Sequence, residues 1–233
     1  MMKKIMLFTI VLCLLLAGCS QTGQIDAAES ELPVETEAEQ DASGSAEQES
    51  PAARIQPLPD TTMESWTDAI LSVSLEEGDA YVDDTGKMQM DLKIYTYDKY
   101  DMVDISLLKA GDIIVTHAGE VEVTSVERSE NGAVYINGGL DAGGFDLVTD
   151  DSGIFYETGF NDAKNWYEVG EATIRVSVDF KGYDNADPDK GEVIIYPGDF
   201  LTEGVVNYDF TPYNTTIRVE AGQIVEMNRV YVP

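Results

Sequence analysis

Oxygen-bearing side chains recur at close spacing in one acidic segment of this sequence. Asn185, Asp187 and Asp189 occupy every second position, and Glu192 follows them. Oxygen donors at this spacing correspond to positions 1, 3 and 5 of a calcium-binding loop. Lys190 stands where that loop requires glycine, however, and no glutamate follows at its twelfth position. We therefore expect a solvated turn and no cofactor, with calcium binding by these four residues as the alternative.

His117 is the only histidine, so any reaction that uses an imidazole must use this one. It ends an apolar run, with Asp112 and Glu120 near it in sequence. No Gly-x-Ser-x-Gly segment supplies an activated serine. A single histidine also argues against a zinc site built from several His ligands. We expect a strand-end residue with an ordinary hydrogen bond, and we predict no catalytic residue.

Aromatic residues next to polar ones form a third group. Tyr95 and Tyr97 share one face of a predicted strand, while Trp166 and Tyr167 follow the polar segment Phe160, Asn161 and Asp162. Exposed aromatic rings beside Asn and Asp stack on sugars or anchor protein partners. We therefore predict ligand contacts at Tyr95, Tyr97, Trp166 and Tyr167. The alternative is that the tryptophan fills the protein interior.

The first twenty residues have the pattern of an export signal. Lys3 and Lys4 precede an apolar run from Ile5 to Ala17, which is shorter than the roughly 20 residues that a membrane-spanning helix needs. The run ends in Leu-Ala-Gly followed by Cys19, which resembles the lipobox of bacterial lipoproteins. That resemblance implies cleavage after residue 18 and a lipid on the sulfur of Cys19. It predicts a signal peptide over residues 1–18 and a lipid-anchored protein outside the cytoplasm.

Residues 19–60 have the composition of a disordered tether. The segment holds no aromatic residue, and its many acidic residues face a single base, Arg54. Such a chain buries too little apolar surface to offset the loss of conformational entropy on folding. Its like charges and terminal prolines favour an extended spacer between the membrane and the folded region.

The charge of the whole chain limits its partners. The sequence holds 44 acidic and 14 basic residues, for a net charge of -30. A surface of this kind repels nucleic acid and anionic lipid head groups, so we expect no nucleic-acid partner. The expected partners are the membrane, through the lipid, and an extracellular protein or carbohydrate.

Short alternating runs separated by turn residues follow from residue 61 to residue 233. The clearest run is Met88–Asp98, and the stretch Ile105–Gly139 contains Gly-Asp, Ala-Gly and Asn-Gly turns typical of a meander. At least eight such runs predict an all-β antiparallel small barrel or sandwich, with an SH3-like meander and further strands. A subdivision of this region near Gly143 is an alternative.

Three classes of function are compatible with this sequence. The chain as a whole resembles uncharacterised β-rich surface lipoproteins of Gram-positive bacteria, a resemblance that implies no particular activity. We interpret the folded region as a non-enzymatic β domain that binds a ligand or partner. The alternatives are an envelope hydrolase that uses carboxylates and His117, and a structural component of an envelope assembly.

Overall fold

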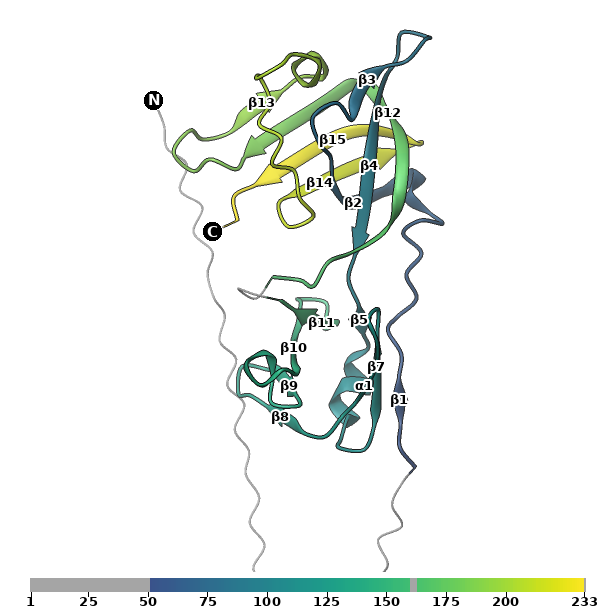
Figure 1. Cartoon of the computed structure of the whole chain (residues 1–233), viewed down its shortest axis with the longest axis vertical. Coiled ribbons are helices and arrows are strands. Elements are labelled where there is room, and N and C mark those ends of the chain that lie inside the picture. The colour runs from purple at the N-terminus through teal and green to yellow at the C-terminus, as the bar shows by residue number, and fades with distance from the viewer. Residues whose placement is uncertain (1–50, 160–162, 233) are drawn as a thin grey trace, which may run out of the picture. The chain divides into compact units, whose positions relative to one another are not determined.

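The computed structural model of the chain describes residues 51–159 and 163–232, which are built almost entirely of strands (Figure 1). The all-β class with a small barrel is therefore confirmed. The signal segment, Cys19 and the tether up to residue 50 lie outside the described residues. The described residues belong to one compact unit that contains two hydrophobic cores.

Five strands close into a barrel around the first core. They are β2 (Ala69–Ser74), β4 (Met88–Thr96), β12 (Tyr167–Asn185), β14 (Thr215–Glu220) and β15 (Gln223–Val230). If these five strands are numbered 1 to 5 in chain order, their order around the barrel is 1-2-3-5-4, and strand 4 closes the barrel by pairing with strand 1. Strands 3 and 5, which are β12 and β15, run parallel. This is the Greek-key arrangement of an OB-type barrel. A barrel topology by itself does not assign a function.

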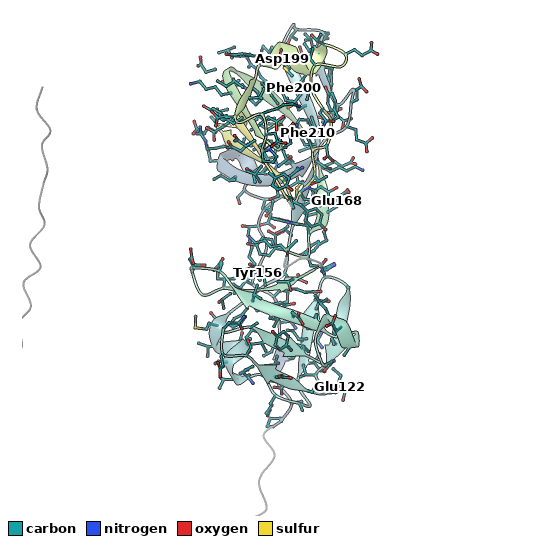
Figure 2. All side chains as sticks on the ribbon, turned by 90° about the vertical axis from the view of Figure 1, so that its left-hand side faces the viewer. Glu122, Tyr156, Glu168, Asp199, Phe200 and Phe210 are labelled. Carbon is teal, nitrogen blue, oxygen red and sulfur yellow. The ribbon has the colours of Figure 1, made fainter. Side chains whose placement is uncertain are left out.

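The alternating pattern of β4 explains how this barrel is filled. Met90, Leu92 and Ile94 point inward and are at most 2% exposed, while Asp91 and Lys93 between them face solvent. The short strands β3 (Ala80–Val82) and β13 (Val193–Ile195) extend the sheet at its two edges. The helical turn η4 (Pro197–Leu201) places Phe200 against Phe210, with ring centroids 6.0 Å apart (Figure 2).

The second core lies in an insertion, residues 97–166, between β4 and β12. Its elements are β5 (Lys99–Tyr100), α1 (Met102–Leu107), β6 (Ile113–Thr116), β7 (Gly119–Glu122), β8 (Val126–Arg128), β9 (Val134–Ile136), η2 (Leu140–Ala142), β10 (Phe145–Thr149) and β11 (Phe155–Thr158). Strands β6 and β7 form one sheet with β1 (Arg54–Ile55), and β8 to β11 form another with β5. The compact unit therefore contains two cores, and a subdivision near Gly143 stays an untested prediction.

The predicted meander is divided between these two sheets. Its Ala-Gly turn joins β6 to β7, and its Asn-Gly turn joins β8 to β9. Strands β7 and β8 are not paired with each other, because the chain crosses from one sheet to the other between them. The turns were predicted correctly, but the closed barrel is built from the segments that flank the meander.

The folded region begins earlier than the predicted end of the tether. Strand β1 (Arg54–Ile55) pairs in parallel with β6, and the side chain of Ile55 is buried in the second core. The buried carboxylate of Asp112 accepts hydrogen bonds from the backbone of Ala53 at 2.7 Å and of Lys109 at 2.9 Å. Burial alone would raise the pKa of Asp112, but these bonds lower it. Residues 51–60 thus belong to the folded part, and the helical turn η1 (Trp66–Asp68) follows them.

Candidate functional site

His117 lies in the turn between β6 and β7 and contacts a buried carboxylate. Its backbone N–H donates to Oδ2 of Asp98 at 2.7 Å, and its ring Nδ1 lies 3.1 Å from the same oxygen. The Asp98 side chain is 3% exposed and that of His117 is 27% exposed. Asp112 and Glu120, its acidic neighbours in sequence, bond elsewhere, Glu120 to Arg54. The histidine is therefore part of an Asp–His pair that opens toward solvent.

Glu157 of β11 brings a second carboxylate to this pair. One donor atom each of Asp98, His117 and Glu157 lies within 4.8 Å of the others. The amide of Asn165 donates to Oε1 of Glu157 at 2.9 Å. Burial raises the pKa of Glu157, the charge of Asp98 adds to this rise, and the Asn165 bond and His117 oppose it. We call these three residues the Asp98–His117–Glu157 cluster.

Tyr167, the first residue of β12, holds the cluster in place. Its ring stacks on that of His117, with centroids 4.2 Å apart and planes 15° apart. Its hydroxyl donates to Oδ1 of Asp98 at 3.1 Å. Burial and the nearby Asp98 carboxylate raise the pKa of Tyr167, so the phenol remains a donor at neutral pH. This contact joins the start of β12 to Asp98, which lies two residues after the end of β4.

A second group next to this cluster is made of aromatic rings and a lysine. The ring of Tyr97 meets Trp166 edge-on at 4.9 Å and Tyr156 edge-on at 5.6 Å. The ammonium group of Lys164 lies 4.2 Å from the centroid of the Tyr97 ring and donates to its hydroxyl at 2.9 Å. All four side chains are partly exposed, and Figure 2 labels Tyr156 among them. We call Tyr97, Tyr156 and Trp166 the aromatic cluster.

The structure brings together three of the four residues predicted as ligand contacts. Tyr97, Trp166 and Tyr167 lie within or beside the two clusters, whereas Tyr95 lies on the outer face of β4 and bonds Ser74 at 3.1 Å. The neighbouring Phe160, Asn161 and Asp162 lie outside the described residues. The sequence reasoning missed Asp98, Tyr156, Glu157 and Lys164.

One of these missed residues carried a signal in the sequence. Asp98 continues the inward phase of Met90, Leu92 and Ile94, and an acid at an inward position indicates a buried polar contact. Glu157 carried no such signal, because its proximity to His117 depends on how β11 pairs with β10 and β5. The local periodicity of a sequence does not predict long-range strand pairing of this kind.

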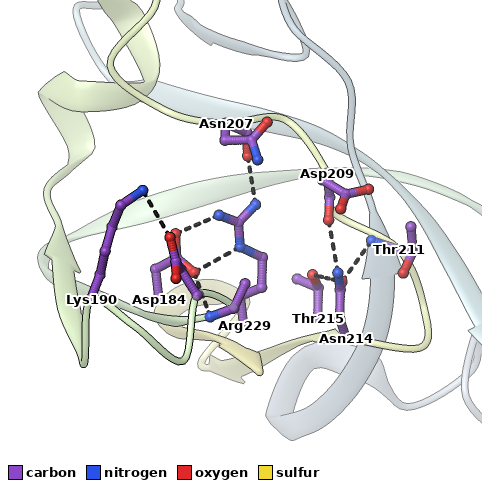
Figure 3. Close-up of polar contacts among 10 residues, drawn as sticks. Asp184, Lys190, Asn207, Asp209, Thr211, Asn214, Thr215 and Arg229 are labelled. Carbon is purple, nitrogen blue, oxygen red and sulfur yellow. Dashed lines mark hydrogen bonds and ion pairs between the residues drawn. The ribbon is translucent and has the colours of Figure 1, made fainter. Parts of the chain in front are cut away.

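The acidic segment, predicted as a solvated turn with calcium binding as the alternative, contains two ion pairs. Asp184 binds Arg229 through two bonds, with Nε and Oδ1 2.9 Å apart (Figure 3). The ammonium group of Lys190 lies 2.9 Å from Asp187. Within residues 51–159 and 163–232, the Asp98–His117–Glu157 cluster is the one group of three His, Cys, Asp or Glu side chains at metal-ligand distances. Calcium binding by Asn185, Asp187, Asp189 and Glu192 stays an untested prediction.

Two cavities open on the surface of the barrel region, one of them beside the acidic segment. A cavity of about 460 Å³ is lined by Arg229, Lys190, Asp184 and their neighbours, and another of about 370 Å³ lies across β4 and β12. The second is lined by Asp79, Asp91 and Glu171 together with a single lysine, Lys93. This is the strand face with which OB-type barrels bind oligonucleotides, and its carboxylates would repel a phosphate backbone.

Comparison of the chain with protein-family models, curated proteins and solved structures finds no match. The part of the chain that the structure describes contains no helix with the length and apolarity needed to cross a bilayer. Chemically, the site combines an Asp–His pair suited to proton transfer, three potential metal donors, and aromatic faces beside polar groups. The class that these features define is an all-β protein with one candidate site at the ends of its insertion.

Proposed function

We propose that the chain is a lipid-anchored lipoprotein of the extracytoplasmic surface, whose β region binds an extracellular ligand without catalysis. The observation that carries the binding function is the partly exposed aromatic cluster beside the polar groups of Asn165, Tyr167 and Lys164. The anchoring rests on the lipobox at Cys19 and the acidic spacer that follows it. A Gram-positive cell surface is the setting that these features favour.

The anchor is tested by removing its sulfur. Cys19→Ala in the full chain should leave an unprocessed precursor that no longer incorporates labelled palmitate. Cys13→Ala is the matched control, since Cys13 lies within the apolar run and should be processed like the wild type. Mass spectrometry and metabolic labelling in a Gram-positive host measure both. Equal processing and labelling of the two variants would contradict lipidation at Cys19.

Carbohydrate is the ligand class that the aromatic cluster fits best. Aromatic faces pack against the C–H faces of sugar rings, while amide, hydroxyl and ammonium groups at their rim bond the sugar hydroxyls. Asn165 and Tyr167, on either side of Trp166 in the sequence, carry an amide and a hydroxyl, and the ammonium group of Lys164 lies 5.7 Å from the centroid of the Trp166 ring. A surface position would expose this cluster to the polysaccharides of the cell envelope.

An array of envelope oligosaccharides tests this ligand class with the full chain. Wild-type protein should be retained on a defined set of glycans, and Trp166→Ala should weaken retention at least tenfold, which is about 1.4 kcal/mol. Tyr213→Ala is the control, because Tyr213 is 51% exposed and lies outside the aromatic cluster. Glycans retained equally by the Trp166 and Tyr213 variants, or no retained glycan, would contradict the proposal.

The Asp98–His117 pair favours a second candidate function, hydrolysis in the envelope. A carboxylate that holds the Nδ1 side of an imidazole leaves Nε2 to accept a proton from an attacking water. Under this function, a glycan retained on the array is shortened during incubation, and His117→Ala stops the shortening without loss of binding. If the retained glycans remain intact with the wild-type protein, the result supports binding and contradicts hydrolysis.

A further inference from the structure

We propose that the Asp98–His117–Glu157 cluster is a binding site for a divalent transition-metal ion of the zinc class. The three side chains offer one imidazole nitrogen and two carboxylate oxygens, all within 4.8 Å of one another. Zinc binds this set of donors at about 2.0–2.2 Å in sites where water or substrate completes the coordination. The inference goes beyond the proposed ligand binding and does not depend on it.

The spacing of the Asp–His pair fits a shared metal ion. Nδ1 of His117 and Oδ2 of Asp98 are 3.1 Å apart. An ion about 2.0–2.1 Å from each atom would make an angle of roughly 100° between them, close to that of a tetrahedral site. One oxygen of Glu157 lies within 4.8 Å of a donor atom of each of the other two residues, so its side chain is near enough to supply a third ligand.

Neighbouring groups hold each of the three donors in orientation. Asp98 accepts the backbone N–H of His117 on one oxygen and the hydroxyl of Tyr167 on the other. The Tyr167 ring fixes the plane of the imidazole by stacking, and Asn165 binds one oxygen of Glu157. Carboxylates and imidazoles that bind metals are oriented in this way by outer hydrogen bonds, which raise affinity by fixing the donor geometry.

In the part of the chain that the structure describes, no lysine or arginine forms an ion pair with the carboxylates of this cluster, so their charge is available to a bound cation. Within the described residues, Asp98 forms an ion pair with His117 alone, and Glu157 forms none with lysine or arginine. Lys99, which follows Asp98 in sequence, and Lys164 both direct their ammonium groups at the ring of Tyr97, at 4.9 and 4.2 Å from its centroid. Two carboxylates beside one imidazole therefore offer a cation two oxygen ligands and one nitrogen ligand.

The donor set also selects the kind of metal. Calcium takes six to eight oxygen ligands and magnesium keeps most of its water, so neither gains from an imidazole. Imidazole with carboxylate suits zinc and its first-row neighbours. The partly exposed His117 leaves an open side for a water ligand, which is the arrangement of an open zinc site and not of a closed structural one.

Isothermal titration of ZnCl₂ into the full chain tests the site, with Cys13→Ser and Cys19→Ser introduced so that no thiol competes. We expect one ion per chain with a Kd on the order of 1 µM or tighter. At a zinc concentration of about 100 Kd, the Tm should rise by roughly 5–10 °C. Titration with CaCl₂ should give no comparable heat.

Variants on the same background separate this site from the acidic segment. Glu157→Gln and His117→Gln should each weaken zinc binding at least tenfold, while Asp187→Asn should bind like the parent. Circular dichroism and the melting curve without metal establish that each variant is folded, and Co²⁺ absorption between 500 and 650 nm reports nitrogen and oxygen ligation. Zinc binding equal in Glu157→Gln and Asp187→Asn, or no binding below about 1 mM, overturns the proposal. Neither result depends on whether any glycan is retained.

Discussion

Gly144→Ala is expected to destabilise the insertion by about 3–5 kcal/mol. A Cβ atom on Gly144 would lie 1.9 Å from the carbonyl oxygen of Ile136 and 2.9 Å from that of Asn137. Both atoms belong to the backbone, so no side-chain rotation can relieve the contact. The next residue, Phe145, pairs with Ile136 in the β9–β10 ladder, and any shift of the backbone would disturb this pairing and the buried Leu147 behind it.

Gly198→Ala is the matched control for this substitution. Gly198 lies in η4, has an ordinary negative φ, and no atom lies within 4 Å of the position that its Cβ would take. Its replacement should leave the free energy of unfolding within about 0.5 kcal/mol of the wild type. Urea titration of the full chain, followed by circular dichroism, measures both variants. A similar midpoint for the two would show that the Gly144 backbone adapts at little cost.

These two glycines show how far local sequence can specify this fold. Gly143 and Gly144 are adjacent, and the local sequence does not distinguish their roles. Gly143 has a φ of 85° and open space around it, whereas Gly144 has an ordinary φ and a crowded backbone. The first requirement is conformational and the second is steric. Only the pairing of β9 with β10 distinguishes them, and that pairing is a property of the folded chain.

The barrel strands were predictable to the extent that their faces differ in solvent exposure. Strands β2, β4, β14 and β15 lie close to the runs identified from alternation. In strand β12 the residues alternate clearly only over Thr173–Phe180, but the strand extends over Tyr167–Asn185, because it pairs first with β4 and then with β15 and β13. Alternation marks a buried face and does not report which partners extend a strand.

Short elements held by single polar contacts were not predicted. Helix α1 spans fewer than two turns and therefore shows no helical period. It begins at Asp101, whose carboxylate accepts the backbone N–H of Val103 at 2.7 Å. The candidate site has the same character, since His117 contacts one oxygen of Asp98 through its backbone N–H and its ring, and Glu157 joins them by proximity. Such contacts connect segments that are distant in sequence, and local patterns therefore carry little information about them.

Asp184→Ala is expected to lower the free energy of unfolding by about 3 kcal/mol at neutral pH. Its partner Arg229 is 4% exposed and donates to the backbone oxygen of Asn207 at 2.5 Å (Figure 3). The Arg229 guanidinium lies 4.6 Å from the centroid of the Phe210 ring. Without Asp184 this guanidinium keeps its charge in a site that water scarcely reaches. Asp187→Ala removes the same charge from an exposed pair in the same loop and should cause no measurable loss.

The loss should depend on pH in a defined direction. Burial would raise the pKa of Asp184, but the hydrogen bond from Arg229 and the backbone N–H of Ala186 lower it below its ordinary value. A carboxyl whose folded pKa is depressed stabilises the fold above its unfolded pKa, about 3.9, and this stabilisation is lost as pH falls through the folded pKa. The difference between wild type and Asp184→Ala should therefore be constant near neutral pH and shrink below about pH 4. Urea titrations at several pH values measure it.

A double variant separates the burial of charge from the packing of this site. Asp184→Leu with Arg229→Met replaces both charges by apolar groups, so no buried ion remains without its partner. Replacements of this kind in protein interiors are often neutral or stabilising. The double variant should therefore recover most of the stability that Asp184→Ala loses. Stability no better than that of Asp184→Ala would mean that the hydrogen bond to Asn207 and the contact with Phe210, not the ion pair, hold the end of β15 in the barrel.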